Sequence, residues 1–165
     1  MKSKTLHSAS MLIAILIFAI GCKKENHTTT EMPVAKPDVV FYALNDMNQL
    51  LKYNAQSTSS AMATVSITGL PAGEKIISID FRPATGQLYG LGTTSRLYTI
   101  NYDNGAAVAV GTTTFTPALN SMVANIDFNP TVDRIRMVTN TGQNFRLHPE
   151  LGTVAATDGS INGGS

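Results

Sequence analysis

The chain has 165 residues, of which 43% are hydrophobic and 14% charged, with a formal net charge of +1. This length fits one ordinary domain, and the low, balanced charge argues against a nucleic-acid partner. The single cysteine excludes a disulfide framework and a cysteine-rich zinc site. Three histidines in the whole chain argue against a multi-histidine metal centre.

The N-terminus has the pattern of an export signal. Lys2 and Lys4 precede an unbroken apolar run, residues 11–20, which is followed by a glycine and then the only cysteine, Cys22. These ten apolar residues would rise about 15 Å as a helix, roughly half of a bilayer's hydrocarbon core, so the run is too short to span a membrane. The sequence therefore predicts a signal peptide over residues 1–21.

The residues at the expected cleavage point, Ala19-Ile20-Gly21-Cys22, resemble the lipobox of bacterial lipoproteins, with Ala19 in place of the usual Leu. The resemblance implies that Cys22 becomes the first mature residue and carries acyl chains, which hold a protein firmly at a membrane. We therefore expect a lipid anchor in the outer membrane of the cell envelope, on the periplasmic face or at the cell surface. A secreted protein without lipid, with Cys22 in the signal by chance, is the alternative.

Residues 22–38 are predicted to form the lipid anchor and a flexible tether, because they are polar, contain two prolines and have no apolar periodicity. Residues 23–25, Lys-Lys-Glu, faintly resemble the signal that sends some lipoproteins of the Bacteroidetes type to the cell surface. A solvated linker is the plainer interpretation.

From Val39 onward, short apolar-alternating runs are separated by Gly, Pro, Asn, Asp and Thr, and strand signals recur about every ten residues. This pattern is typical of an all-β sandwich, barrel or propeller. No stretch after the signal peptide has helical spacing over enough residues to predict a helix. We expect one all-β domain over residues 39–165.

The domain repeats itself, without a gap, at an interval of 47 residues. Ile79-Asp80-Phe81 returns as Ile126-Asp127-Phe128, and the first copy keeps the same apolar register. The predicted units are 39–75, 76–121 and 122–165. Further positions that match at this interval are Pro83 with Pro130, Leu88 with Ile135, Leu91 with Val138, Gly105 with Gly152, Tyr42 with Tyr89 and Leu50 with Leu97.

Each full unit is predicted to contain four strands. In the middle unit these are IISIDF, QLYGLG, RLYTINY and AAVAVG, joined by turns rich in Gly, Pro and Asn; in the third they are VANIDF, RIRMVT, NFRLH and TVAAT. Alternation along the first of them places Ile77, Ile79 and Phe81 on one face and Ser78 and Asp80 on the other. The first unit lacks its first strand, because the equivalent residues fall in the proline-bearing tether.

A repeated four-stranded unit of this length is typical of a β-propeller blade. Residues 39–165 hold about 2.7 units, whereas single-chain propellers have about four to eight blades. The chain is therefore a fragment of a longer propeller, an open stack, or a protomer that completes a ring with others. We favour the fragment.

Two stretches, IDFRPATGQLYGLG and IDFNPTVDRIRMVTNTGQNFRLHPELG, carry a close resemblance to domain of unknown function 4394, a family of secreted bacterial proteins. The resemblance extends from about Val39 to about Gly159. Members look like β-propeller relatives and usually continue past the end of this chain. Residues 148–152, HPELG, depart from the family's more usual Asn-Pro-Asp-Thr-Gly type of turn. The family has no assigned activity, so the resemblance implies no catalytic residue.

Residues that break the repeat are the better candidates for a ligand-binding face. Alternation places two arginines on one face of one strand and three polar residues on one face of the next strand. Together they could hold a small anionic ligand such as a carboxylate or phosphate. A solvated or blade-to-blade face, balanced by Asp133 and Glu150, is the alternative that we favour. The candidate residues are Arg134, Arg136, Asn144, Arg146 and His148, which replace Gln87, Tyr89, Leu97, Thr99 and Asn101.

Asp80 and Asp127 occupy the same position in successive units, so we expect them to serve the fold by accepting hydrogen bonds from a neighbouring turn. In an enzyme alternative, which rests on fold analogy alone, these aspartates and Asn125 bind a divalent metal on the axis of a lactonase-like or lyase-like hydrolase. Outside that alternative we expect no cofactor. The main prediction is a lipid-anchored binding or scaffold module with a protein or small anionic ligand as partner, and an inactive truncated chain is a third possibility.

Overall fold

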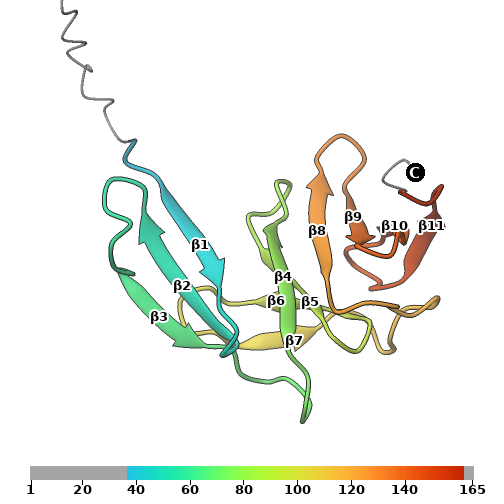
Figure 1. Ribbon diagram of the computed structural model, residues 1–165, viewed down its shortest axis with the longest axis horizontal. Coiled ribbons are helices and arrows are strands. Elements are labelled where there is room, and N and C mark those ends of the chain that lie inside the picture. The colour runs from blue at the N-terminus through green and yellow to red at the C-terminus, as the bar shows by residue number, and fades with distance from the viewer. Residues whose placement is uncertain (1–36, 162–165) are drawn as a thin grey trace, which may run out of the picture. The chain divides into compact units, whose positions relative to one another are not determined.

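The computed structural model describes residues 37–161, which form eleven β-strands and no helix, and this confirms the all-β prediction (Figure 1). Accordingly, no helix in this part of the chain is long and apolar enough to cross a membrane. The predicted signal peptide, Cys22 and nearly all of the predicted tether lie outside the described residues.

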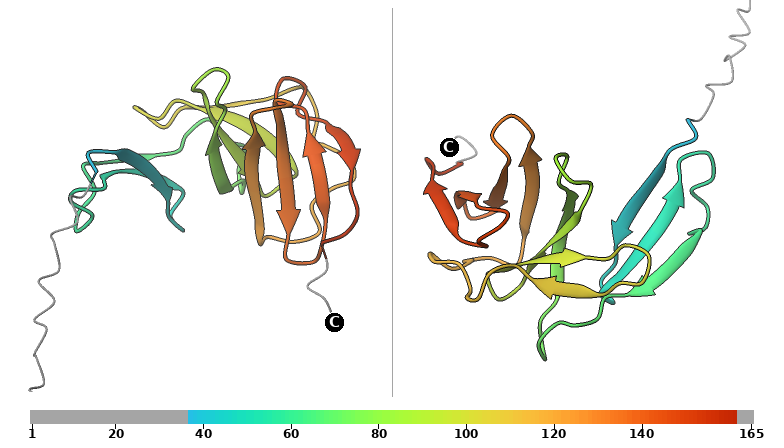
Figure 2. Two further views of the ribbon diagram at one scale, coloured as in Figure 1. Left: turned by 90° about the horizontal axis from the view of Figure 1, so that it is seen from above. Right: turned by 180° about the vertical axis from the view of Figure 1, so that it is seen from behind.

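The strands form three antiparallel sheets, and in each sheet the strands follow one another in chain order (Figure 2). Within residues 37–161 the first sheet has one strand fewer than the other two, and the tether residues in which its first strand was predicted to be missing lie outside this range. Sheet 1 contains β1 (Val40–Leu44), β2 (Gln49–Asn54) and β3 (Ala63–Ser66). Sheet 2 contains β4 (Ile76–Phe81), β5 (Leu88–Gly92), β6 (Arg96–Ile100) and β7 (Ala107–Ala109). Sheet 3 contains β8 (Ala124–Asn129), β9 (Arg134–Thr139), β10 (Asn144–Leu147) and β11 (Val154–Thr157).

Two hydrophobic cores hold the sheets together, and sheet 2 contributes to both. Alternate residues of its strands face opposite ways, so Leu91 and Leu97 pack with sheet 3 while Leu88 and Ile100 pack with sheet 1. All four side chains are fully buried. The sheet is thus apolar on both faces, as expected of a sheet that lies between two others.

The first strand of sheet 2 contacts the first strand of sheet 3 through side chains. Ser78 Oγ accepts a hydrogen bond from the Ile126 N–H at 3.0 Å, and Asp80 Oδ2 accepts one from the Phe128 N–H at 2.7 Å. Asp80 therefore serves the fold, as predicted, but its donor lies in a strand and not in a turn. The same prediction for Asp127 is wrong, because its carboxylate is exposed and has no hydrogen-bond partner among residues 37–161. The bonds of Ser78 and Asp80 fix the position of β8 beside β4, because unpaired backbone N–H groups at a sheet edge need an acceptor.

The predicted face assignment of Ile77 is wrong. Ile79 and Phe81 pack toward sheet 1, whereas Ile77 packs against the core shared with sheet 3. The register of β4 with β5 shifts between Ile76 and Ser78, so a bulge at Ile77 reverses the side on which that side chain lies.

Candidate functional site

The predicted ligand face lies on sheet 3. Arg136 in β9 is directly opposite Arg146 in β10, and on its other side it is opposite Asp127 in β8. Two like charges on opposed positions repel each other unless a carboxylate lies between them. That carboxylate belongs to Asp158, which follows the last residue of β11.

Asp158 binds both guanidinium groups. Arg146 donates from Nε at 3.0 Å and from Nη2 at 2.7 Å, while Arg136 donates from Nη1 to the same carboxylate. The hydrogen bonds from Arg146, followed by those from Arg136, hold the pKa of Asp158 below its ordinary value. In this arginine cluster (Arg136, Asp158 and Arg146) two cations share one bound anion, and Asp127, opposite Arg136 in β8, adds a second carboxylate to the same face.

The other predicted residues are bound by their local surroundings. Asn144 joins the cluster, since its Oδ1 accepts from Arg136 Nη1 at 2.6 Å and its Nδ2 donates to the Gly159 carbonyl at 2.9 Å. Arg134 instead donates to the Asp133 carbonyl at 2.9 Å, and His148 Nδ1 accepts from the Glu150 N–H at 3.2 Å. The structure therefore brings together Arg136, Asn144 and Arg146 and leaves Arg134 and His148 in separate contacts.

Asp133 and Glu150, which we expected to balance the charge of the candidate face, both bind Arg82. Arg82 Nε donates to Asp133 Oδ1 at 2.9 Å, and its Nη2 lies 3.2 Å from Glu150 Oε1. The Arg82 side chain is only 10% exposed. The hydrogen bonds from Arg82 lower the pKa of Asp133. The bonds to Asp133, and after them the bond to Glu150, raise the pKa of Arg82. This ion pair joins the loop after β4 to the turn before β9.

The residues of the metal alternative are not gathered into a site. Asp80 Oδ2 is held by the Phe128 N–H, whereas Asp127 and Asn125 are exposed on the opposite face of β8 from the core. Within residues 37–161, no three or more His, Cys, Asp or Glu side chains are grouped closely enough to hold a metal ion.

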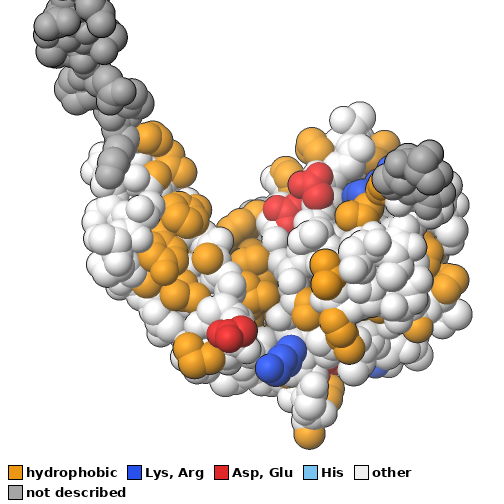
Figure 3. Space-filling view, in the orientation of Figure 1, with side chains coloured by type: hydrophobic (Ala, Val, Ile, Leu, Met, Phe, Trp, Pro, Cys, Tyr) orange, Lys and Arg blue, Asp and Glu red, His pale blue; other side chains and the backbone are white. Residues whose placement is uncertain are grey.

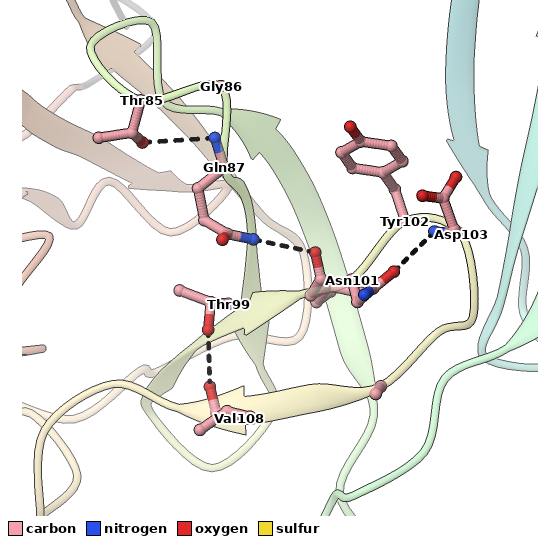
Figure 4. A pocket seen from close by; sticks show the side chains of 10 residues that line it. Thr85, Gly86, Gln87, Thr99, Asn101, Tyr102, Asp103 and Val108 are labelled. Atoms are coloured by element: carbon pink, nitrogen blue, oxygen red, sulfur yellow. Dashed lines mark hydrogen bonds between the residues drawn. The ribbon is translucent and has the colours of Figure 1, made fainter.

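A groove of about 570 Å³ lies on sheet 2, at positions that sequence reasoning did not single out (Figure 4). Gln87, Thr99 and Asn101 line it, and all three hydrogen-bond to nearby backbone: Gln87 Nε2 donates to the Ile100 carbonyl at 3.1 Å, and Asn101 Oδ1 accepts from the Asp103 N–H at 2.9 Å. These polar groups brace the strand ends. Tyr102, 38% exposed, lies beside them on the turn after β6. The groove offers surface for contact, but its polar groups are largely used by the fold.

The described residues thus define an all-β protein of packed antiparallel meanders whose strongest polar contacts are ion pairs and side-chain bonds between sheets. Residues 49–165 match the family described as Domain of unknown function (DUF4394), and the chain belongs to this family. No curated protein matches the sequence. The family predicted from the motifs is therefore confirmed, and with it the expectation that no activity is assigned.

Proposed function

We propose that this protein is a lipid-anchored binding and scaffold module of the cell envelope, built from β-propeller blades that repeat every 47 residues. Strand pairing supports the repeat: the opposed pairs Tyr42 with Lys52, Tyr89 with Thr99 and Arg136 with Arg146 follow one another at this interval. Each pair joins the same two strands of its sheet. An insertion or deletion between these strands would have broken the register.

Backbone conformation supports the same repeat. Asn48, Ser95 and Gly142 stand 47 residues apart, and all three have a positive φ, of 60°, 65° and 91°. Non-glycine residues rarely adopt this conformation, so its recurrence points to one turn built three times. Asn48 and Ser95 also use their side chains alike, each accepting a hydrogen bond from a backbone N–H farther along the chain, at Ile76 and at Leu119.

One observation carries the binding role: Arg136 and Arg146 remain 41% and 46% exposed although both contact Asp158. A guanidinium has five N–H donors, so each arginine keeps donors free for another acceptor. Their unused donors and planar geometry suit a carboxylate or a phosphate, either on a small molecule or on the surface of a partner protein.

The test uses the full chain in mild detergent, titrated with inorganic phosphate and with succinate, while amide resonances near Asn144 and Asp158 are followed by NMR. We expect saturable shifts with a dissociation constant in the millimolar range. In Arg146→Gln this dissociation constant should rise about tenfold, because one charge-assisted contact is lost. Lys75→Gln, a cation in the loop before β4, is the matched control and should bind as the wild type does. Shifts that do not saturate, or that persist in Arg146→Gln, would remove anion binding from the proposal.

The anchor is tested separately. Cells given an alkyne fatty acid should incorporate it into the wild type and not into Cys22→Ala, which should also leave the membrane fraction. Elemental analysis of the purified protein separates the proposal from the hydrolase alternative, because a stoichiometric divalent ion would favour the enzyme.

A further inference from the structure

A groove of about 240 Å³ separates β1 from β4. It is lined by residues 40–42 of β1, residues 79–81 of β4 and Leu88. In Figure 3, hydrophobic side chains line both sides of the hollow next to β1. Val40 and Phe41 are 44% and 40% exposed, so apolar surface lies open on a strand.

The edge of β1 that faces this groove has no partner among residues 37–161. β1 pairs with β2 along one edge only, whereas the matching strands β5 and β9 each pair with a neighbour on both edges. An open strand edge presents N–H and C=O groups that can pair with another chain. The groove is therefore bounded by a strand edge with which no described residue pairs.

The neighbouring junction gives a template for what would fit. There β4 lies beside β5, in the place that matches the open edge of β1, and pairs with it in antiparallel register with Phe81 opposite Leu88. The side chains of Ser78 and Asp80 in β4 accept hydrogen bonds from the Ile126 and Phe128 N–H groups. These N–H groups point away from β9. Phe128 lies opposite Ile135 as Phe81 lies opposite Leu88, so the N–H groups of Ile79 and Phe81 point away from β5, toward the groove.

We propose that this groove binds an extended segment of another protein, which adds to β1 as an antiparallel strand. Its chemistry follows from the template: a hydroxyl or amide residue opposite Leu44, an apolar residue opposite Ala43, an Asp opposite Tyr42, and an apolar residue opposite Phe41. The hydroxyl and the carboxylate accept bonds from the Ile79 and Phe81 N–H groups. The apolar side chains extend the surface formed by Phe41 and its stacked partner Tyr53, whose ring centroids are 5.4 Å apart.

This mode of recognition is β-strand addition, in which main-chain bonds give affinity and alternate side chains give specificity. The Asp of the guest strand gives the specificity here, because an ionised acceptor on a backbone N–H makes a stronger bond than a neutral one. The proposal adds a second surface to the protein and depends on strand pairing, not on the arginine cluster.

The probe is a capped peptide with the sequence of residues 75–82, KIISIDFR, which carries the required order of side chains. It is added to the full chain in mild detergent, and amide hydrogen exchange is followed by NMR. We expect the Ile79 and Phe81 amides, together with edge amides of residues 40–44, to exchange at least tenfold more slowly at saturating peptide. A peptide with Asp80→Ala should bind about tenfold more weakly, and the Arg146→Gln protein should bind the original peptide unchanged.

Three results would overturn the proposal. Unchanged exchange at Ile79 and Phe81 would mean that the groove takes no strand. Slow exchange before peptide is added would mean that the chain itself fills the groove, or that a second copy does so if protection rises with protein concentration. Equal affinity for the Asp80→Ala peptide would remove the side-chain bonds on which the specificity depends.

Discussion

The two junctions between sheets are built differently, although sheet 2 takes part in both. At the β4–β8 junction, between sheets 2 and 3, the side chains of Ser78 and Asp80 bind the backbone of the next strand, and Arg82 binds Asp133 across the gap. At the β1–β4 junction, between sheets 1 and 2, Asn48 Oδ1 accepts a hydrogen bond from the Ile76 N–H at 2.9 Å, and aromatic rings make the contact between β1 and β4 themselves. Tyr42, Phe81 and Tyr102 lie there with ring centroids 5.4–5.8 Å apart.

The difference teaches what a first strand contributes to each sheet. With β8 present, the β4–β8 junction is closed by directional bonds that set one register. With no strand beside β1 in the described residues, the β1–β4 junction keeps a groove and relies on apolar contact, which is less directional. Side-chain bonds between the two strands that meet therefore mark the closed junction, and open apolar surface marks the one that we propose accepts a partner.

Truncation of the core should separate the junctions most clearly. Leu97 packs at the β4–β8 junction and Leu50, its equivalent 47 residues earlier, packs at the β1–β4 junction; both are fully buried. We expect Leu97→Ala to lower the free energy of unfolding by about 4 kcal/mol and Leu50→Ala by about 2 kcal/mol, because side chains bordering the open groove can relax into the cavity. Urea denaturation monitored by circular dichroism measures both. Equal losses would mean that the groove gives no extra freedom to relax.

Loss of the ion pair across the β4–β8 junction should have the next largest effect. Asp133→Asn leaves the buried guanidinium of Arg82 with Glu150 alone. Asn accepts the positive φ of this position, so the variant removes charge with little backbone strain. We expect a loss of about 2 kcal/mol at neutral pH, measured by the same denaturation. Asp103→Asn, in an exposed turn, is the control and should change stability by less than about 0.5 kcal/mol.

The side-chain bond between β4 and β8 is tested by a pair of equivalent aspartates. Asp80→Ala removes the acceptor of the Phe128 N–H and should cost about 1–2 kcal/mol. Asp127→Ala changes the same position in sheet 3, where the carboxylate is exposed and has no hydrogen-bond partner among the described residues, and should cost less than about 0.5 kcal/mol. If both variants lose the same stability, the bridge adds nothing to the junction.

Much of the fold could be predicted from the sequence, because short-range chemistry specifies it. Alternation predicted the strands of sheets 2 and 3, and the Gly-containing turns predicted between them include Gly86 and Gly105, both of which have a positive φ. Two prolines in the tether predict that sheet 1 has no first strand, but those residues lie outside the described range. The bulge at Ile77 could not be predicted, since it depends on pairing with β5 and leaves no mark in the apolar pattern.

The candidate site was predicted less completely, because charge partners are chosen by tertiary structure. Alternation can be read from the sequence, and it places Arg136, Asn144 and Arg146 on one face. Their carboxylate, Asp158, comes from the chain after the next strand, and Asp133 is turned toward Arg82 by contacts between sheets. The one available signal was Asp158 itself, an acidic residue directly after the last strand signal.

The smallest effect is expected from the arginine cluster, and acid titration reveals it best. The pKa of Asp158 is lowered by Arg146 and Arg136, so its contribution to stability is complete above the ordinary value of 3.8 and is lost as pH falls through the lower folded value. The same sign holds for Asp133 with Arg82. Thermal melts of wild type, Asp158→Asn and Asp133→Asn from pH 7 to pH 2 should therefore differ at neutral pH and converge in acid. The gap should be wider for Asp133→Asn, because Arg82 is buried whereas the guanidinium groups around Asp158 are partly solvated and screened. An equal gap for both variants would mean that the exposed cluster holds sheet 3 as firmly as the buried pair holds the β4–β8 junction, and would leave the arginines less free for a ligand.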